Sequence, residues 1–179
     1  MIRRAATGVL LGLGLLFSPA SFALEEHFAT LTAFVEVAPV FGLTLNNPHL
    51  AFQSVTPGKT QVLGEGHFFN EVRCRSNSGR SWHLKAQLIS LKHLQQGYAM
   101  PPAQLRLRVV ETTGSAEPTV SRTEFQSFSE QPMLVYSSSG DDNRGRDVAL
   151  RFQYSLSTPE DAPAGVYVGQ IVFTMAESL

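Results

Sequence analysis

Histidine and cysteine are the side chains of this sequence best suited to bind a transition metal. The chain has one cysteine and five histidines, which are His27, His49, His67, His83 and His93. No two histidines stand at i, i+2 or i, i+4, and an H-E-x-x-H motif is missing, so the spacing does not indicate a zinc site. We expect each histidine to lie on the surface, and no metal or other cofactor is predicted.

The stretch from Asp141 to Asp147 is the best candidate for a site that binds a hard cation. Asp141, Asn143 and Asp147 place oxygen-bearing side chains at odd positions, as calcium loops do. The twelfth position, where such loops carry Glu, is Phe152, and two arginines interrupt the stretch. An ordinary solvated hairpin loop is therefore the favoured interpretation.

Residues for nucleophilic or acid–base catalysis are equally sparse. Cys74 has no His or Asn close to it in the sequence, and no serine stands in a G-x-S-x-G motif. Paired carboxylates occur only in expected loops, at Glu25-Glu26, Asp141-Asp142 and Glu160-Asp161. Adjacent residues of an extended chain point apart, which makes such pairs poor acid and base partners. These observations predict a protein that is not an enzyme.

Cys74 alternates with arginines in the sequence Val72-Arg73-Cys74-Arg75. Val72 and Cys74 share one strand face, so we expect a buried thiol that packs as a small apolar residue. An exposed, reactive thiol is the alternative, because the arginines would lower its pKa. A single cysteine also excludes an intramolecular disulfide, so core packing must hold the fold together.

Aromatic side chains could offer a platform for sugar rings. Trp82, Tyr154 and Tyr167 fall on strand faces that are otherwise apolar, which predicts that they belong to the core. Tyr98 stands near Pro101-Pro102 and is the aromatic residue that we expect to be exposed.

The elements that must position these residues are strands, because apolar and polar residues alternate with a period of two along most of the chain. In the segment 81–88 the apolar face consists of Trp82, Leu84, Ala86 and Leu88, and the opposite face is polar. The same alternation predicts half-buried strands at 105–109 and 148–156. The segment 167–175 is apolar on both faces, which predicts a central strand and not an edge strand.

Weaker strands are predicted at seven further segments, 34–37, 41–45, 50–52, 61–63, 68–74, 123–128 and 133–136. Turn signals rich in Gly, Pro, Asn and Asp separate them, and only 90–97 is expected to form a short helical turn. So many short strands predict an all-β, two-sheet antiparallel β-sandwich of immunoglobulin-like type. Residues 24–179 are expected to form one domain, since one core suffices for this length.

Residues 1–23 have the features of a secretory signal peptide. Arg3 and Arg4 precede an apolar run at 9–17, and Ser21-Phe22-Ala23 is a small-x-small cleavage pattern. The apolar run is too short to span a bilayer. We therefore expect cleavage after Ala23 and an exported product without a transmembrane segment, which is secreted, periplasmic or held at the cell surface.

The charge of the expected product is slightly negative. Without Arg3 and Arg4, the 14 basic residues fall to 12 against 15 acidic residues, a formal charge of −3. A nucleic-acid binder concentrates positive charge against phosphates, so no nucleic-acid partner is expected.

Two motifs of the sequence resemble the WxL domain of bacterial surface proteins. Trp82-His83-Leu84 reads W-x-L after a Ser-Asn-Ser-Gly turn, and the segment 163–167 reads P-x-G-x-Y. The closing strand carries Phe173-Thr174-Met175 where the family has a second W-x-L motif. The resemblance covers roughly residues 43–175. It implies a secreted β-rich domain that attaches to the cell wall, with binding residues at Trp82, Leu84, Phe173 and Met175.

Two functions follow from these features. The first is an envelope or cell-surface domain that associates with the cell wall or with other envelope proteins. The alternative is a pilin-like structural subunit that self-associates by adding a strand to an exposed sheet edge. A subunit that accepts a strand should polymerise, whereas a self-sufficient domain should stay monomeric and sediment with wall fragments.

Overall fold

The computed structural model describes residues 33–177 of the 179-residue chain. The predicted signal peptide, residues 1–23, lies outside the described residues. The chain divides into two units, Met1–Glu36 and Val37–Leu179, and the second contains every strand described below. Within residues 33–177, no helix has the length and apolar character needed to cross a membrane.

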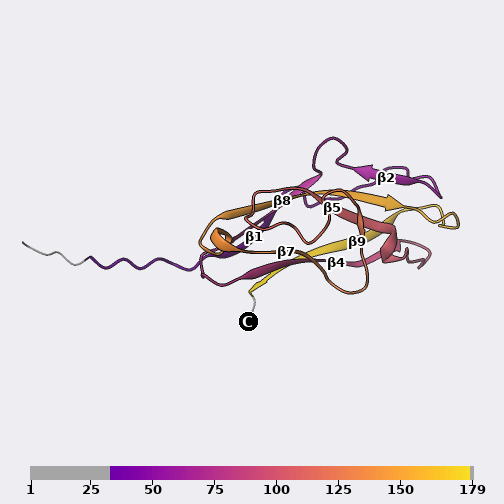
Figure 1. Cartoon of the computed structure of the whole chain (residues 1–179). Helices are drawn as coiled ribbons and strands as arrows, with labels where there is room; N and C mark the ends of the chain where they lie inside the picture. The colour runs from indigo at the N-terminus through magenta and orange to yellow at the C-terminus, as the bar shows by residue number, and fades with distance from the viewer. Residues whose placement is uncertain (1–32, 178–179) are drawn as a thin grey trace, which may run out of the picture. The chain divides into compact units, whose positions relative to one another are not determined.

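Nine strands and two short 3-10 turns make up the described part of the chain (Figure 1). The strands are β1 (Phe41–Leu45), β2 (Thr60–Leu63), β3 (Asn70–Ser76), β4 (Trp82–His93), β5 (Leu105–Thr112), β6 (Gln126–Ser127), β7 (Met133–Ser137), β8 (Asp147–Ser157) and β9 (Tyr167–Glu177). The 3-10 turns are η1 (Pro102–Gln104) and η2 (Gly140–Asn143).

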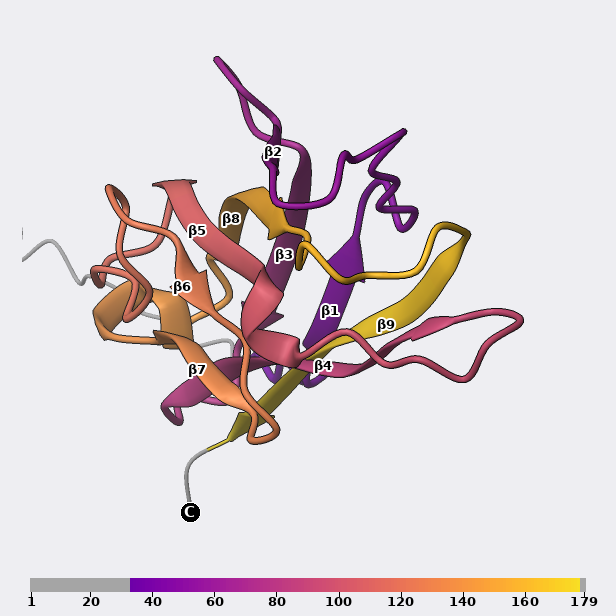
Figure 2. The same ribbon diagram turned by 90° about the vertical axis from the view of Figure 1, so that its right-hand side faces the viewer.

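The strands form two antiparallel sheets. Sheet A has the order β1-β3-β8-β5-β6, with β2 also paired to β8, and sheet B has the order β7-β4-β9. Figure 2 shows β6 and β7 on one side of the two sheets and β1 and β9 on the other. The predicted all-β, two-sheet antiparallel sandwich is confirmed, while its immunoglobulin-like type stays a prediction.

The core lies between the sheets and is built from the alternating residues that the sequence indicates. Sheet B contributes the inward residues of β4, and sheet A contributes those of β3, β5 and β8. The largest fully buried side chains include Trp82, Tyr136, Tyr154, Phe152 and Leu107. Burial of one such side chain contributes about 1.5–3 kcal/mol, which a fold without a disulfide needs.

β8 is buried on both faces because a loop covers its outer side. Gln153, on the outer face, is buried and donates through Nε2 to the carbonyl oxygens of Gly64 and His67. The outward Ala149 and Ser155 are buried as well. The sequence of β8 therefore alternates apolar and polar residues, as in a strand with one solvated face, although β8 is central and buried on both faces.

The helical turn predicted at 90–97 is wrong, because the residues up to His93 continue β4. The His93 N–H donates to the Tyr98 carbonyl at 2.8 Å, and the Met100 N–H donates to the Leu91 carbonyl at 2.8 Å. These bonds fold residues 91–100 into a hairpin. The strand predicted at 50–52 is also absent, since Leu50 and Phe52 pack on the core from a loop.

The central position predicted for the segment 167–175 is wrong as well. β9 pairs with β4 alone among the described strands, so it is an edge strand of sheet B. The apolar pattern of the outer face led to the prediction of a central strand, but such a face is buried only where another part of the protein covers it. Here Val168 and Val172 on the outer face are 50% and 40% exposed.

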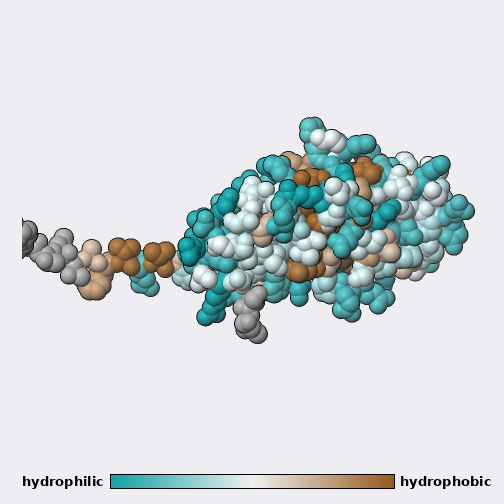
Figure 3. All heavy atoms as spheres, in the orientation of Figure 1, coloured by the Kyte–Doolittle hydropathy of each residue, from teal (hydrophilic) through white to brown (hydrophobic). Residues whose placement is uncertain are grey.

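The strand predicted at 34–37 is not formed either. The ladder between β1 and β3 ends where Phe41 faces Ser76, so residues before Phe41 have no β3 partner. Phe34, Val35 and Val37 are 94%, 83% and 76% exposed. Figure 3 shows that hydrophilic residues cover most of this face of the sandwich, with small hydrophobic patches between them.

Candidate functional site

The free edge of β9 is the feature of the sandwich best suited to contact another chain. β9 is eleven residues long, and its register with β4 runs from Trp82 opposite Glu177 to His93 opposite Tyr167. No described residue pairs with its other edge. An edge strand presents a row of unpaired N–H and C=O groups, which is a template for an added strand.

The composition of β9 leaves this edge unprotected. Natural edge strands carry lysines, prolines or inward-pointing charges that prevent pairing with other chains. β9 contains no Lys, Arg or Pro, and its single charged residue, Glu177, is its last residue. Glu177 lies 3.6 Å from Arg80.

A bulge interrupts only the first part of β9. The register shifts between Leu88 and Leu91, opposite Gly169. A Cβ atom on Gly169 would lie 1.8 Å from the Ser90 carbonyl oxygen, so the bulge requires glycine. The following residues, Ile171 to Glu177, form a regular stretch without a bulge.

The inward face of β9 is apolar and incompletely covered. Ile171, Phe173 and Met175 lie opposite the buried Leu88, Ala86 and Leu84 in the register, yet are only half-buried. The Phe173 ring packs on Phe152 with ring centroids 5.3 Å apart. Their exposure follows from the position of β9 at the edge, where no further strand shields them.

The edge of sheet A on the same side has the same character. Leu43 and Leu45 of β1 pair with the buried Cys74 and Val72 and are themselves half-buried. We call the apolar margin formed by Leu43, Leu45, Ile171, Phe173 and Met175 the β1/β9 seam. On the opposite side of the sandwich (Figure 2), the loop residues Val120 and Phe128 are fully buried.

The four binding residues implied by the WxL resemblance fall into two groups. Trp82 is 1% exposed and Leu84 is fully buried, so neither can touch a ligand in this structure. Phe173 and Met175 lie in the β1/β9 seam and are half-buried. The prediction that Trp82 belongs to the core is confirmed. The implied role of Trp82 and Leu84 as binding residues is wrong for this structure, because both side chains are buried.

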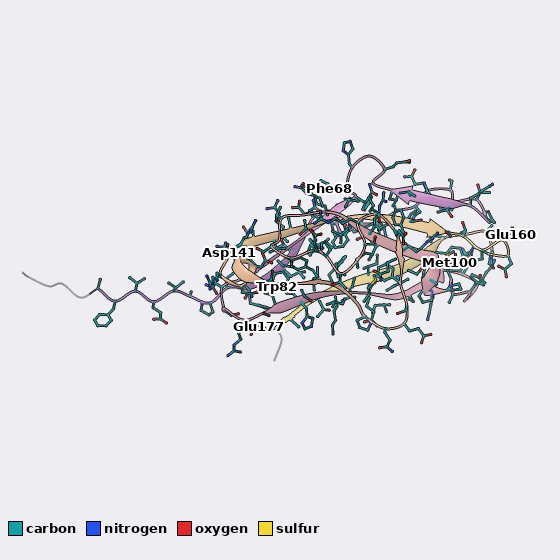
Figure 4. All side chains as sticks on the ribbon, in the orientation of Figure 1. Phe68, Trp82, Met100, Asp141, Glu160 and Glu177 are labelled. Carbon is teal, nitrogen blue, oxygen red and sulfur yellow. The ribbon has the colours of Figure 1, made fainter. Side chains whose placement is uncertain are left out.

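A buried carboxylate beside Trp82 was missed by the sequence analysis. Asp142 accepts hydrogen bonds from the Tyr136 hydroxyl at 2.6 Å and from the Ser115 and Ser139 N–H groups at 2.9 and 3.2 Å. Its carbonyl accepts the Trp82 indole N–H at 3.2 Å. Figure 4 places Trp82 and the neighbouring Asp141 at the same end of the sandwich.

This carboxylate acts as a structural anchor and not as part of a cation loop. Burial, followed by the hydrogen bond to Asp142, raises the pKa of Tyr136, so the phenol remains a donor to the carboxylate. Asp141 is exposed, and Asp147 lies 3.6 Å from Arg75. Within residues 33–177, no cluster of three or more His, Cys, Asp or Glu residues could hold a metal ion.

His93 departs from the expectation that every histidine lies on the surface. It is buried, and its Nδ1 accepts the N–H groups of Gln95 and Gln96 at 3.0 Å each. Its Nε2 lies 3.1 Å from the Ala164 carbonyl, and its ring meets Tyr167 edge-on at 5.1 Å. The ring therefore joins the tip of the β4 hairpin to the loop before β9. No spacing rule reveals such a contact.

The other residues singled out from the sequence are not brought into one site. Tyr98, expected to be exposed, is half-buried and meets Tyr167 edge-on at 6.1 Å. Tyr154 lies in the core, as predicted. Glu160 and Asp161 occupy an exposed turn, while Glu25-Glu26 lies outside the described residues.

Cys74 is buried in the core, which confirms the prediction of an inward thiol. Burial raises the pKa of the Cys74 thiol to about 12, so almost no thiolate exists at neutral pH. We expect a thiol reagent to label the native protein slowly and the urea-unfolded protein quickly, as measured by mass spectrometry over time. Fast labelling of the native protein would contradict the buried position.

Comparisons with known proteins identify no family for this chain. No protein-family model matches the sequence, and no curated protein matches it. One similar solved structure is that of a family 123 glycoside hydrolase from Clostridium perfringens, described for glycolipid glycan hydrolysis. The identity is 10%, the TM-score is 0.42, and the match covers 76% of this chain. The chain corresponds to only 25% of that enzyme's length.

The prediction that the protein is not an enzyme does not stand beside this similarity and is corrected. That prediction relied on missing local motifs, and the similar solved structure is a glycoside hydrolase. Catalytic residues often come together from distant strands, so local spacing is a poor basis for excluding them. At 10% identity and a TM-score of 0.42, the similarity does not assign a catalytic function to this chain either.

Proposed function

We propose that this protein is an exported structural subunit of the bacterial envelope or cell surface, which assembles when a strand of a neighbouring chain pairs along the free edge of β9. The observation that carries the proposal is an eleven-residue edge strand whose only charge is at its end. Backbone hydrogen bonds along such an edge supply affinity, and side-chain pockets supply specificity.

The apolar residues beside this edge favour association. An added strand would cover the half-buried Ile171, Phe173 and Met175 on one face and the exposed Val168 and Val172 on the other. Fully burying a valine contributes about 1.5 kcal/mol or more, and Val168 and Val172 are already about half-buried, so each contributes less than that. These side chains therefore add to the affinity that the backbone hydrogen bonds of the edge supply.

Attachment to the envelope in this proposal proceeds through neighbouring subunits. Direct wall contact through Trp82 and Leu84 is not included, since both side chains are buried. Export rests on the signal-peptide features of residues 1–23.

A charge placed on the outer face of β9 tests the proposal. We expect the purified wild-type protein to form concentration-dependent oligomers, and Val172→Glu to weaken association by about tenfold or more, because a charge replaces a valine that association buries. Val172 is 40% exposed, so the monomer should keep its fold. Sedimentation velocity measures the association, and thermal unfolding confirms the fold.

Leu134→Glu is the matched control. Leu134 lies on β7, the opposite edge strand of sheet B, and is exposed to a similar extent. This variant should assemble like the wild type, because the added charge lies away from β9. A wild-type protein that stays monomeric, or a folded Val172→Glu protein that assembles normally, would refute the proposal.

A further inference from the structure

We propose that the outer face of sheet B is a docking surface for a lipid bilayer that contains anionic lipid. The inference goes beyond the proposed function, because it concerns the face of the sheet around its central strand β4 and not the free edge of β9. Three observations support it: exposed aliphatic side chains gather on this face, two lysines stand among them, and the outer face of sheet A has a different chemistry.

Beyond β1, the large apolar side chains that are exposed in the described chain all lie on this face. They are Ile89, Leu94, Leu134, Val166, Val168 and Val172, with exposed fractions between 36% and 65%. The strand pairing brings them together. Lys92 pairs with Val168, and beyond this pair the Leu94 N–H donates to the Val166 carbonyl at 2.9 Å. Exposed apolar residues grouped in this way mark an interaction site.

The alternation of side chains along β4 decides which residues point outward. Leu88 and His93 are buried on the inner side, so Ile89 and Lys92, which stand next to them, point away from the core. The other outward residues of β4 are His83, Lys85 and Gln87. Sheet B is the lower layer in Figure 1, and this face is its side away from sheet A.

The charges on this face are positive, although the expected product is negative overall. Lys85 and Lys92 point outward from β4, and no outward residue of β4, β7 or β9 is acidic. Glu130 lies at the border of the face, where its carbonyl accepts the Gln87 Nε2 at 3.1 Å. A lysine can lay its aliphatic stem along apolar surface and keep its ammonium group in a polar layer. The face therefore complements a partner that is apolar inside and negatively charged at its surface.

A bilayer fits this chemistry better than a sugar or a second copy of the chain does. No Phe, Tyr or Trp is among the outward residues of β4, β7 and β9, so the face offers no aromatic platform for sugar rings. A second copy packed through the same face would bring lysines into the contact without carboxylates to pair them, which is costly. An anionic bilayer offers phosphate groups to Lys85 and Lys92 and acyl chains to Ile89 and Leu94.

The outer face of sheet A carries charges of both signs, which are paired with one another. Glu71 binds both Arg73 and Arg151, and Arg151 also binds Glu111 at 2.6 Å. Charges that are already paired within the sheet offer little to an anionic surface. The sandwich therefore has one face suited to water and one suited to a bilayer, and we expect it to approach lipid through sheet B.

Co-sedimentation of the exported full chain with lipid vesicles tests the proposal. The probes are vesicles of phosphatidylcholine alone and vesicles of phosphatidylcholine and phosphatidylglycerol in equal parts. We expect the wild type to bind the mixed vesicles more tightly. Lys85→Gln/Lys92→Gln should bind them about thirtyfold less tightly, since each lysine beside an anionic surface accounts for about fivefold. Ile89→Ser/Leu94→Ser should lose about tenfold or more, because less apolar surface is buried.

Matching changes on sheet A serve as controls, and thermal unfolding checks that every variant is folded. Lys59→Gln/Arg75→Gln removes the same charge beside β2 and on β3, and Phe41→Ser removes an apolar side chain that is 47% exposed on β1. Both should bind vesicles like the wild type. Equal binding of the two vesicle types, or wild-type binding by the lysine variant, would refute the proposal. A wild type that binds neither vesicle also refutes it, and a loss of self-association in Ile89→Ser/Leu94→Ser would then assign the face to a second copy.

Discussion

Replacing Trp82 with alanine is expected to lower the free energy of unfolding by about 3–5 kcal/mol. The Trp82 side chain is 1% exposed, and its ring centroid lies 5.5 Å from that of Tyr136. Truncation leaves a cavity beneath the start of β4 and removes the indole N–H bond to the Asp142 carbonyl. A loss of this size is a substantial share of the stability of a domain of this length. Urea denaturation, with thermal melts alongside, measures it.

Trp82→Phe is the matched control, because it keeps a six-membered aromatic ring in the core and loses the pyrrole ring with its N–H. Its loss should be clearly smaller than that of the alanine variant. An unchanged melting temperature for Trp82→Ala would contradict the core position. A sedimentation assay with cell-wall fragments completes the test: if Trp82→Ala stays stable and folded but no longer binds the fragments, the residue is a wall contact.

Replacing Asp142 with alanine should lower the free energy of unfolding by about 3 kcal/mol. The change leaves the Tyr136 hydroxyl and the Ser115 and Ser139 N–H groups without their acceptor. The Tyr136 hydroxyl is buried and loses a hydrogen bond to a charged group, which accounts for about 1.5–3 kcal/mol. The Ser115 and Ser139 N–H groups belong to exposed residues and add less, and the relief of a buried charge offsets part of the sum. Urea denaturation at neutral pH measures the difference.

The adjacent Asp141 supplies the control. Its side chain is exposed on the same 3-10 turn, so Asp141→Ala should change stability by less than about 0.5 kcal/mol. Equal effects of the two substitutions would show that the turn as a whole, and not the buried carboxylate, stabilises this end of the sandwich.

The sandwich has a buried core without any added strand, which makes the assembly proposal testable on folded protein. Val72, Leu84, Leu107 and Phe152 are fully buried in the isolated chain. The apolar residues of the β1/β9 seam are half-buried. Substitutions on the outer face of β9 should therefore change association with little change in folding.

Much of the fold follows from the sequence, because a period of two reports which face of a strand is apolar. That pattern located β4, β5 and β8 and predicted the inward positions of Trp82 and Cys74, as the structure confirms. Turn residues separated the strands, and their number and length indicated a two-sheet sandwich.

The lateral neighbours of each strand were decided only by the tertiary structure. Alternation says nothing about which strand pairs with which, so an apolar pattern on both faces predicted a central β9 where the fold has an edge. The same limit applies to residues 34–37, whose pattern is strand-like although β3 ends before reaching them.

The burial of polar residues could not be predicted from the sequence, for a related physical reason. Asp142 and His93 have the composition of surface residues, and their burial depends on donors and acceptors supplied by distant segments. A polar group is stable in the core only when such partners are in place, and the chain brings them together only on folding. The sequence alone therefore determined the strands and their inward faces. Strand order, the open edge and the buried polar contacts were decided by the tertiary structure, because each depends on segments far apart in the chain.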